Sequence, residues 1–141
     1  MSDLDRAYRR AVYRLELPAG PIDLAIGRPS APLARLLREH RARSAAFLTA
    51  WNPGSVLTDP EVNRAAQTAL VESAARLGHP TLPGVAVDPD GTWPDEESVL
   101  VLGIDLAAAR DLAGRFGQNA LVWIGADAIP TLVWVNGRDA P

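Results

Sequence analysis

The apolar run at residues 98–102 constrains the fold more than any other part of the sequence. It reads Ser-Val-Leu-Val-Leu with no charge between its ends, as strands covered on both faces of a sheet usually do. Further strand-like runs lie at 13–17, 22–26, 45–51, 85–87, 120–124 and 131–135. The sequence therefore predicts a sheet with helices packed against it.

The segments between these runs have helical spacing of apolar residues, at 2–11, 30–40, 58–78 and 105–117. In the second, His40 ends a stripe that contains Leu33 and Leu37, so His40 is predicted to be a partly buried structural residue. The third begins with Thr-Asp-Pro-Glu, a capping box in which the Thr58 side chain is predicted to accept from the Glu61 amide.

The predicted order of elements is α-ββ-α-β-α-ββ-α-ββ, in a single α/β domain over residues 1–141, with α+β as the alternative. One mixed β-sheet with helices packed on it is expected, because the strand pairs at both ends argue against a purely parallel sheet. The last apolar run, 132–135, is predicted to be either a central strand or an exposed edge. A second chain would cover such an edge, so an oligomer through it is one expectation.

Composition excludes several classes of protein. Hydrophobic residues make up 48% and charged residues 22%, values that exclude disordered and coiled-coil chains. Cysteine is absent and only two histidines are present, so we predict no metal site and no cofactor. Glycine-rich dinucleotide and phosphate motifs and the nucleophile elbow are also missing from the sequence.

The charge is unevenly distributed along the chain. The net charge is −3, which argues against a basic nucleic-acid-binding protein. Residues 1–43, however, carry nine arginines against five acidic residues, whereas residues 44–141 carry five arginines against twelve. An anionic partner of the first third therefore stays open, beside the simpler interpretation of a salt-bridged surface.

Neither a membrane span nor a secretory signal is predicted. No segment approaches the ~18 consecutive apolar residues that a membrane helix needs. The opening residues, Met-Ser-Asp-Leu-Asp-Arg, lack the apolar stretch of a signal peptide. We therefore expect a cytoplasmic protein of bacterial type.

Polar side chains follow two of the predicted strands. Trp51 and Asn52 stand where a strand runs into an Asn-Pro-Gly turn, the position at which ligand crevices open in α/β sheets. Asn52 offers a donor and an acceptor and Trp51 a flat apolar wall, although both could equally serve their own loop and the core. Gln118 and Asn119 lie between a helix exit and a strand, where they could orient a ligand or satisfy the last helix carbonyls.

Three consecutive acidic residues, Asp95, Glu96 and Glu97, precede the buried run. Crowded carboxylates raise one another's pKa, and a carboxyl with a raised pKa can act as a general acid or base. Glu97 is the candidate catalytic residue because it lies nearest to the buried strand. The alternative is an ordinary solvated loop.

Three sequence blocks together carry a family resemblance. They are Thr-Ala-Trp-Asn-Pro at 49–53, Trp93-Pro94 with Glu97-Ser98 leading into 99–103, and Phe-Gly-Gln-Asn-Ala at 116–120. With these blocks the chain resembles the bacterial family catalogued as domain of unknown function 3293, and the hairpin at 8–26 looks similar too. Because no activity is assigned to the family, the resemblance implies a set of positions and not a reaction.

Three functions are compatible with these residues. The first is a small binding module for a polar small molecule or a protein partner, with Trp51, Asn52, Gln118 and Asn119 as the ligand-binding residues. The second is a small hydrolase or transferase in which Glu97 is the acid or base and Asn52 and Gln118 are polar donors. The third is weak nucleic-acid binding through the arginine-rich first third. The first is preferred, because the sequence contains no recognisable activated nucleophile.

Overall fold

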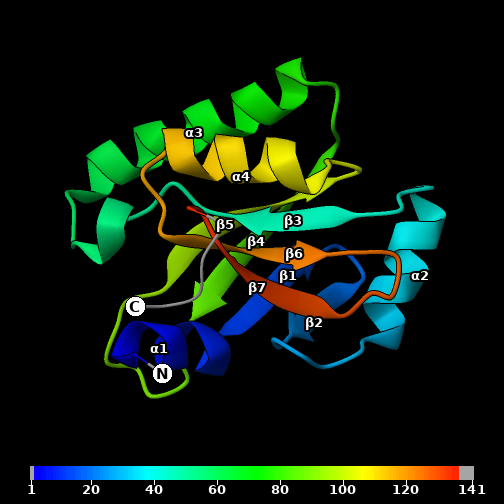
Figure 1. Cartoon of the computed structure of the whole chain (residues 1–141), viewed down its shortest axis with the longest axis horizontal. Helices are drawn as coiled ribbons and strands as arrows, with labels where there is room; N and C mark the ends of the chain where they lie inside the picture. The colour runs from blue at the N-terminus through cyan, green and yellow to red at the C-terminus, as the bar shows by residue number, and fades with distance from the viewer. Residues whose placement is uncertain (1, 137–141) are drawn as a thin grey trace.

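A seven-stranded sheet forms the centre of the structure (Figure 1). The computed structural model describes residues 2–136. Across the sheet the strands follow the order β2-β1-β4-β5-β3-β6-β7. Their bounds are Val12–Leu17 (β1), Gly20–Leu24 (β2), Ala45–Leu48 (β3), Thr81–Val87 (β4), Glu96–Leu102 (β5), Ala120–Ile124 (β6) and Pro130–Trp134 (β7).

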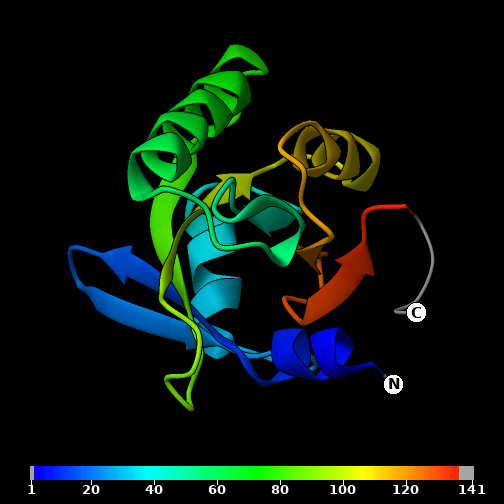
Figure 2. The same ribbon diagram turned by 90° about the vertical axis from the view of Figure 1, so that its left-hand side faces the viewer.

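The helices cover both faces of this sheet. Helices α3 and α4 lie on one face, and α1 and α2 lie on the other (Figure 1, Figure 2). Their bounds are Asp3–Arg10 (α1), Ala31–Glu39 (α2), Pro60–Arg76 (α3) and Leu106–Arg115 (α4), with a short 3-10 turn at Pro53–Ser55. The predicted order of elements is confirmed, and the fold is of the α+β kind.

The prediction of a mixed sheet is wrong, because every strand pairing among the described residues is antiparallel. The reason lies in the connections. Strand pairs β1–β2, β4–β5 and β6–β7 are consecutive neighbours, whereas α2, α3 and α4 each connect strands that are not neighbours in the sheet. A parallel pair needs a crossover between adjacent strands, and no connection here makes one.

Strand β5 is buried on both faces, as predicted. Leu100 and Leu102 belong to the core beneath α2. Val99 and Val101 pack on the other face, in the core beneath α3 and α4. Alternation along the strand thus assigns even-numbered residues of β5 to the face of α1 and α2.

The capping box predicted for α3 is wrong. Asp59 is the N-cap, and its side chain accepts from the Glu61 amide at 2.8 Å. The Thr58 amide instead donates to Asn52 Oδ1 at 2.9 Å, and the Thr58 hydroxyl donates to the Val56 carbonyl. Because its amide is bound to Asn52, Thr58 belongs to the loop before α3 and is not the N-cap of the helix.

The predicted burial of His40 is also wrong, since the side chain is exposed. Helix α2 ends at Glu39, and His40 is the C-cap with non-helical backbone angles. The residue therefore leaves the apolar stripe, which ends with the buried Leu33, Leu36 and Leu37.

Several strand ends differ from the predicted ones. Strand β3 ends at Leu48 and not at Trp51, and β4 begins four residues before the predicted 85. Of the two positions predicted for the last strand, the edge is the one observed, because β7 ends the sheet beside β6. The earlier end of β3 leaves residues 49–52 free to turn toward the site described next.

Candidate functional site

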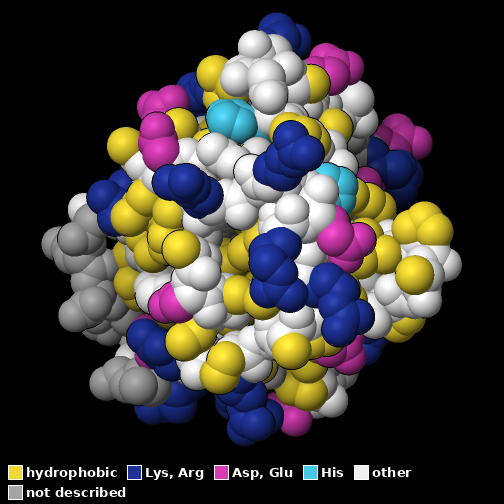
Figure 3. Space-filling model, turned by 90° about the vertical axis from the view of Figure 1, so that its right-hand side faces the viewer, with side chains coloured by type: hydrophobic (Ala, Val, Ile, Leu, Met, Phe, Trp, Pro, Cys, Tyr) yellow, Lys and Arg dark blue, Asp and Glu magenta, His cyan; other side chains and the backbone are white. Residues whose placement is uncertain are grey.

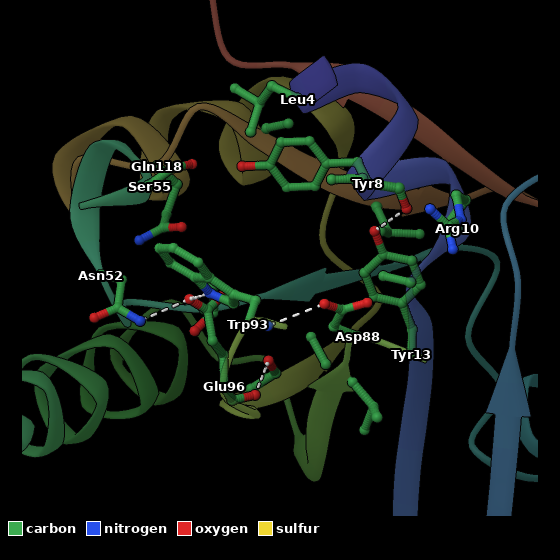
Figure 4. Close-up of a pocket in the computed structure, with 18 of the residues that line it drawn as sticks. Leu4, Tyr8, Arg10, Tyr13, Asn52, Ser55, Asp88, Trp93, Glu96 and Gln118 are labelled. Atoms are coloured by element: carbon green, nitrogen blue, oxygen red, sulfur yellow. Dashed lines mark hydrogen bonds between the residues drawn. The ribbon is translucent and has the colours of Figure 1, made fainter. Parts of the chain in front are cut away.

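A cavity of about 490 Å³ lies between α1 and the sheet (Figure 4). Its size is in the usual range for small-molecule pockets. The walls come from α1, from β1 and the ends of β3 and β4, from the turn at 88–93, from the start of β5 and from the start of β6. Segments far apart in sequence thus meet around one hollow.

Two loops are joined to close one end of this cavity. The Gly54 amide donates to the Gly117 carbonyl at 2.8 Å, which places the loop after β3 beside the loop before β6. Ser55 from the first loop and Gln118 from the second both line the cavity. Residues from two loops at strand ends therefore meet at this end of the cavity.

Glu96 is the carboxyl group of this site. As the first residue of β5 it lies on the face of α1, together with the pocket residue Ser98. Its Oε2 atom accepts from Asn52 Nδ2 and from Trp93 Nε1, both at 2.8 Å. No described residue donates to Oε1, so this oxygen is left open toward the cavity.

A buried network fixes the orientation of Asn52. The Asn52 amide donates to Asn63 Oδ1, and Asn63 Nδ2 donates back to Asn52 Oδ1, both at 2.9 Å. Asn52 Oδ1 also accepts from the Thr58 amide. With its oxygen bound by two donors, Asn52 can present only its NH₂ group to Glu96. The left-handed backbone that this requires, with φ of 48°, is one that Asn tolerates.

The hydrogen bonds decide where Glu96 carries a proton. Trp93 Nε1 and Asn52 Nδ2 are donors only, so Oε2 acts as an acceptor whether or not the carboxyl is ionised. When Glu96 is protonated, its proton therefore lies on Oε1. Burial raises the pKa of Glu96 above its ordinary value, and the hydrogen bonds from Trp93 and Asn52 lower the pKa in part.

Tyr8 faces Glu96 from the opposite wall of the cavity, on α1 (Figure 4). Its pKa is raised, first by burial and then by the negative charge of Glu96, while hydrogen bonds to the side chains of Ser55 and Asn119 lower it. The ring packs edge-on against Trp134, with the centroids 5.5 Å apart. Tyr8 is therefore held in place by β7 while its hydroxyl remains in the site.

Gln118 turns its amide nitrogen away from the cavity. Nε2 donates to the Trp51 carbonyl at 3.1 Å and to the Phe116 carbonyl at 3.4 Å. The carbonyl oxygen of Gln118 is the end-group atom that remains for the cavity, beside Trp93 in Figure 4. Gln118 is thus an acceptor toward the pocket.

The acidic residues at the rim are all neutralised locally. Asp90 forms an ion pair with Arg10. Asp88 accepts from the amides of residues 90, 92 and 93 and from the Thr92 hydroxyl, and these hydrogen bonds, with Thr92 first, lower its pKa. Asp3 pairs with Arg6 on the same helix. Glu96 is therefore the one lining acid without a cation or a turn to balance its charge among the described residues.

The remaining lining of the cavity is mostly apolar and aromatic. The core side of the cavity is formed by Phe47, Leu48, Ala120, Leu121 and Val122. Tyr13 adds its ring, which packs on Phe47 with the centroids 5.3 Å apart, and donates its hydroxyl to the Tyr8 carbonyl. Apart from the paired charges at the rim, the polar side chains of Asn52, Ser55 and Gln118 lie at the end near Glu96 (Figure 4).

Some of the candidate site residues predicted from the sequence line the cavity, and others do not. Asn52 and Gln118 line the cavity. Trp51 and Asn119 do not line it, but each contacts a lining residue: the Trp51 carbonyl accepts from Gln118, and Asn119 Nδ2 donates to Ser55 Oγ at 3.0 Å. Glu97 is exposed and lies on the opposite face of β5 from Glu96.

Glu96, Trp93, Tyr8 and Ser55 line the cavity but are not among the sequence candidates. The sequence did contain a signal for Glu96. Because successive residues of a strand point to opposite faces, Glu96 lies on the same face of β5 as Ser98, and Glu97 lies on the other. The tryptophan of the site is Trp93 and not Trp51. The sequence does not indicate that Tyr8 belongs to a site, because an aromatic residue on the apolar side of a helix is typical of a hydrophobic core.

Four of the nine arginines of the first third form ion pairs with described acidic side chains. Arg9 pairs with Asp5 and Arg14 with Asp23, in addition to the pairs of Arg6 and Arg10. On the face of the molecule that carries α2, basic side chains are interrupted by hydrophobic and acidic ones (Figure 3). This pattern favours a salt-bridged surface over a continuous basic patch.

Two absences hold for residues 2–136. No group of His, Cys, Asp or Glu in this range is arranged to hold a metal ion. None of the helices in the same range has the length and apolar character needed to cross a bilayer.

Comparison with known proteins gives one match. Residues 48–121, just over half of the chain, match the model of a family described as a protein of unknown function (DUF3293). No curated protein and no solved structure matches. The matched segment contains Asn52, Trp93, Glu96 and Gln118, whereas Tyr8 and the resembling hairpin at 8–26 lie outside it.

Proposed function

The chain belongs to the DUF3293 family, and from this premise we propose that its function is to bind a small molecule in the cavity between α1 and the sheet. One observation carries the proposal. Glu96 has one carboxyl oxygen bound by two donors and the other open to a cavity of about 490 Å³. Because no described residue donates to this second oxygen, it is available to a hydrogen-bond donor on a bound molecule.

The shape of the cavity supports the same function. Ligand pockets combine apolar walls with a few converging polar groups. Here the polar groups of Glu96, Gln118, Ser55 and Tyr8 lie at one end, and the apolar side chains of β3 and β6 line the rest. A molecule with one polar end and an apolar body fits this division.

A thermal-shift screen tests the proposal, with a library of amines, amides, alcohols and carboxylates. Compounds that raise the melting temperature are then measured by isothermal titration calorimetry. We expect Glu96→Gln to weaken their binding by about tenfold or more, because it removes the charged acceptor. Glu97→Gln is the matched control, since it makes the same chemical change one residue away on the opposite face.

Two results would contradict the proposal. One is a library without a single compound that stabilises the protein. The other is a set of ligands to which Glu96→Gln and Glu97→Gln bind as tightly as the parent. A protein partner, the other branch of the first hypothesis, would then be sought by pull-down.

A hydrolase or transferase is the second candidate, with Glu96 in the place expected for Glu97. The observation that favours it is a carboxyl group that lines the cavity opposite Tyr8, with both protein donors on Oε2 and none of the described residues donating to Oε1. In this function Asn52 and Trp93 hold the carboxyl, and Oε1 exchanges the proton with substrate. Turnover of an ester or glycoside panel that is lost in Glu96→Gln and kept in Glu97→Gln would establish it.

Nucleic-acid binding, cytoplasmic location in a bacterium and association through β7 remain predictions. The ion pairs of the first third weigh against nucleic acid. Fluorescence anisotropy with a short oligonucleotide at two salt concentrations tests that function. Cell fractionation tests the location, and analytical ultracentrifugation tests the association.

A further inference from the structure

The donors and acceptors around the cavity are not balanced. Each side-chain nitrogen at its polar end already has a protein acceptor. Asn52 Nδ2 and Trp93 Nε1 donate to Glu96, and Gln118 Nε2 donates to the Trp51 and Phe116 carbonyls. Among the described lining residues at this end, the side-chain N–H that remains for a ligand acceptor group is the second hydrogen of Asn52 Nδ2.

Most hydroxyl protons near this end are engaged as well. Thr49 donates to the Glu97 carbonyl, Ser98 donates to the Glu96 carbonyl, and Thr92 donates to Asp88. The hydroxyls of Tyr8 and Ser55 can either donate or accept. The side-chain oxygens at this end that accept from no described residue are thus Glu96 Oε1 and Gln118 Oε1.

The charges around Glu96 also favour a ligand that donates hydrogen bonds. The charged and titratable groups that face it are Tyr8 from α1, Tyr13 from β1 and Asp88 from the 88–93 turn, together with the Arg10–Asp90 ion pair at the rim. Arg10 is the one cation among the described lining residues, and it is bound to Asp90. The site therefore has an acidic group for which residues 2–136 supply no counter-charge.

The aromatic rings provide a second feature suited to positive charge. Tyr8 and Trp93 lie on opposite sides of the space next to Glu96 (Figure 4), and the buried rings of Tyr13 and Phe47 also line the cavity. Ring faces attract ammonium and guanidinium groups, most strongly where water is excluded. An apolar body attached to the cation would pack on the remaining wall.

We propose that the ligand of this cavity is a small organic cation, an ammonium or guanidinium group on an apolar body, whose N–H groups donate to Glu96 Oε1 and Gln118 Oε1. This inference rests on the proposed function and narrows it to one class of ligand. If Glu96 holds its proton in the empty site, the proton leaves Oε1 for solvent when the cation binds. The complex then contains a carboxylate and a cation, and one proton is released.

The test uses three probes of the same size but different charge, namely benzylamine, benzyl alcohol and benzoate. Binding is followed in the uniformly ¹⁵N-labelled protein by the indole Nε1–H signal of Trp93, which donates to Glu96. The signal is assigned among the four tryptophans by Trp93→Phe. We expect benzylamine to move this signal and to bind about tenfold or more tightly than benzyl alcohol, with benzoate weaker still.

Glu96→Gln provides the critical comparison. The two donors on Oε2 will hold the glutamine oxygen, so that its NH₂ group takes the place of Oε1 and offers a donor where the parent has an acceptor. Benzylamine should then lose at least about tenfold in affinity, whereas Glu97→Gln should bind it like the parent. Far-UV circular dichroism and the melting temperature of each variant establish that both are folded.

Each other outcome overturns the inference in a recognisable way. If benzyl alcohol or benzoate binds as tightly as benzylamine and remains sensitive to Glu96→Gln, the cationic ligand is wrong and the binding function stands. If benzylamine binds equally well to both variants and the parent, Glu96 is not its partner. If none of the three probes moves the Trp93 signal, the inference fails, and the library screen decides separately on the proposed function.

Discussion

The two faces of the sheet are built in different ways. Under α3 and α4, small residues such as Ala46, Ala74 and Ala113 are fully buried and let the helices lie close to the strands. On the other face α1 has only eight residues and rests on β7 through Tyr8 and Trp134. The first face is closed and the second contains the cavity.

A polar connection links these two faces. From α3, Gln67 Oε1 accepts from the Ala50 amide and Asn63 Oδ1 from the Asn52 amide. The closed face thus fixes the loop after β3, and Asn52 from this loop donates across the strand end to Glu96. The difference teaches a division of roles, in which the packed face supplies stability and orients the loop after β3, and the open face supplies the cavity and the polar groups that line it.

The largest effect should come from a cavity made in the closed face. Leu112 of α4 is fully buried, and Leu112→Ala should lower the free energy of unfolding by about 2–5 kcal/mol. Urea denaturation measures the loss. Leu77→Ala is the control, since Leu77 is 50% exposed and its truncation should change stability by less than about 0.5 kcal/mol.

This variant also tests the division of roles. Where Leu112→Ala is still folded, its affinity for a Glu96-dependent ligand should equal that of the parent. A loss of affinity in the folded variant would show that the packing of α4 shapes the cavity directly, and the two faces could not be treated as separate.

The second-largest effect should come from breaking the polar connection between the two faces of the sheet. Asn63 is 1% exposed, and Asn63→Ala leaves the Asn52 amide without its acceptor. An unsatisfied buried group costs about 1–3 kcal/mol, so denaturant melts should show a loss in this range. Ligand affinity should fall too, because the Asn52 oxygen then keeps one of its two donors, the Thr58 amide, and the side chain is oriented less firmly toward Glu96.

Asn119→Ala is the matched control for this prediction. It removes an amide of the same chemistry whose bond to Ser55 is exposed to solvent. Its effect on stability should lie within about 0.5 kcal/mol. Equal losses in the two variants would mean that the buried network has no special role.

The sequence predicts the parts of this architecture that depend on local signals. Asn52 and Gln118 were identified because polar residues directly after a helix or strand end commonly lie at crevices, and both line the cavity. The hairpins β1–β2 and β6–β7 follow from short turns. The position of β3 between β5 and β6 cannot be predicted from local signals, because it depends on contacts between strands far apart in the chain.

The choice between Glu96 and Glu97 shows a second limit. In a half-exposed strand, alternation of apolar and polar residues indicates which face is buried. Strand β5 is apolar on both faces from Val99 to Leu102. The sequence pattern therefore does not indicate whether the even-numbered or the odd-numbered residues of β5 face a site. Nearness to the strand favoured Glu97, and only the position of α1 over the other face assigns Glu96 to the cavity.

The smallest effect should be a pH dependence confined to the open face. Burial raises the pKa of Glu96 in the folded protein, so the folded state keeps the proton to a higher pH than the unfolded state. Stability from this group is therefore complete below the unfolded pKa and is lost as pH rises through the folded pKa. Glu96→Gln cannot lose a proton and keeps the two donors on its oxygen. Its melting temperature relative to the parent should therefore increase between about pH 4 and about pH 7, by less than either change above. Glu97→Gln should show no such trend, and a trend shared by both variants would place its origin outside the cavity.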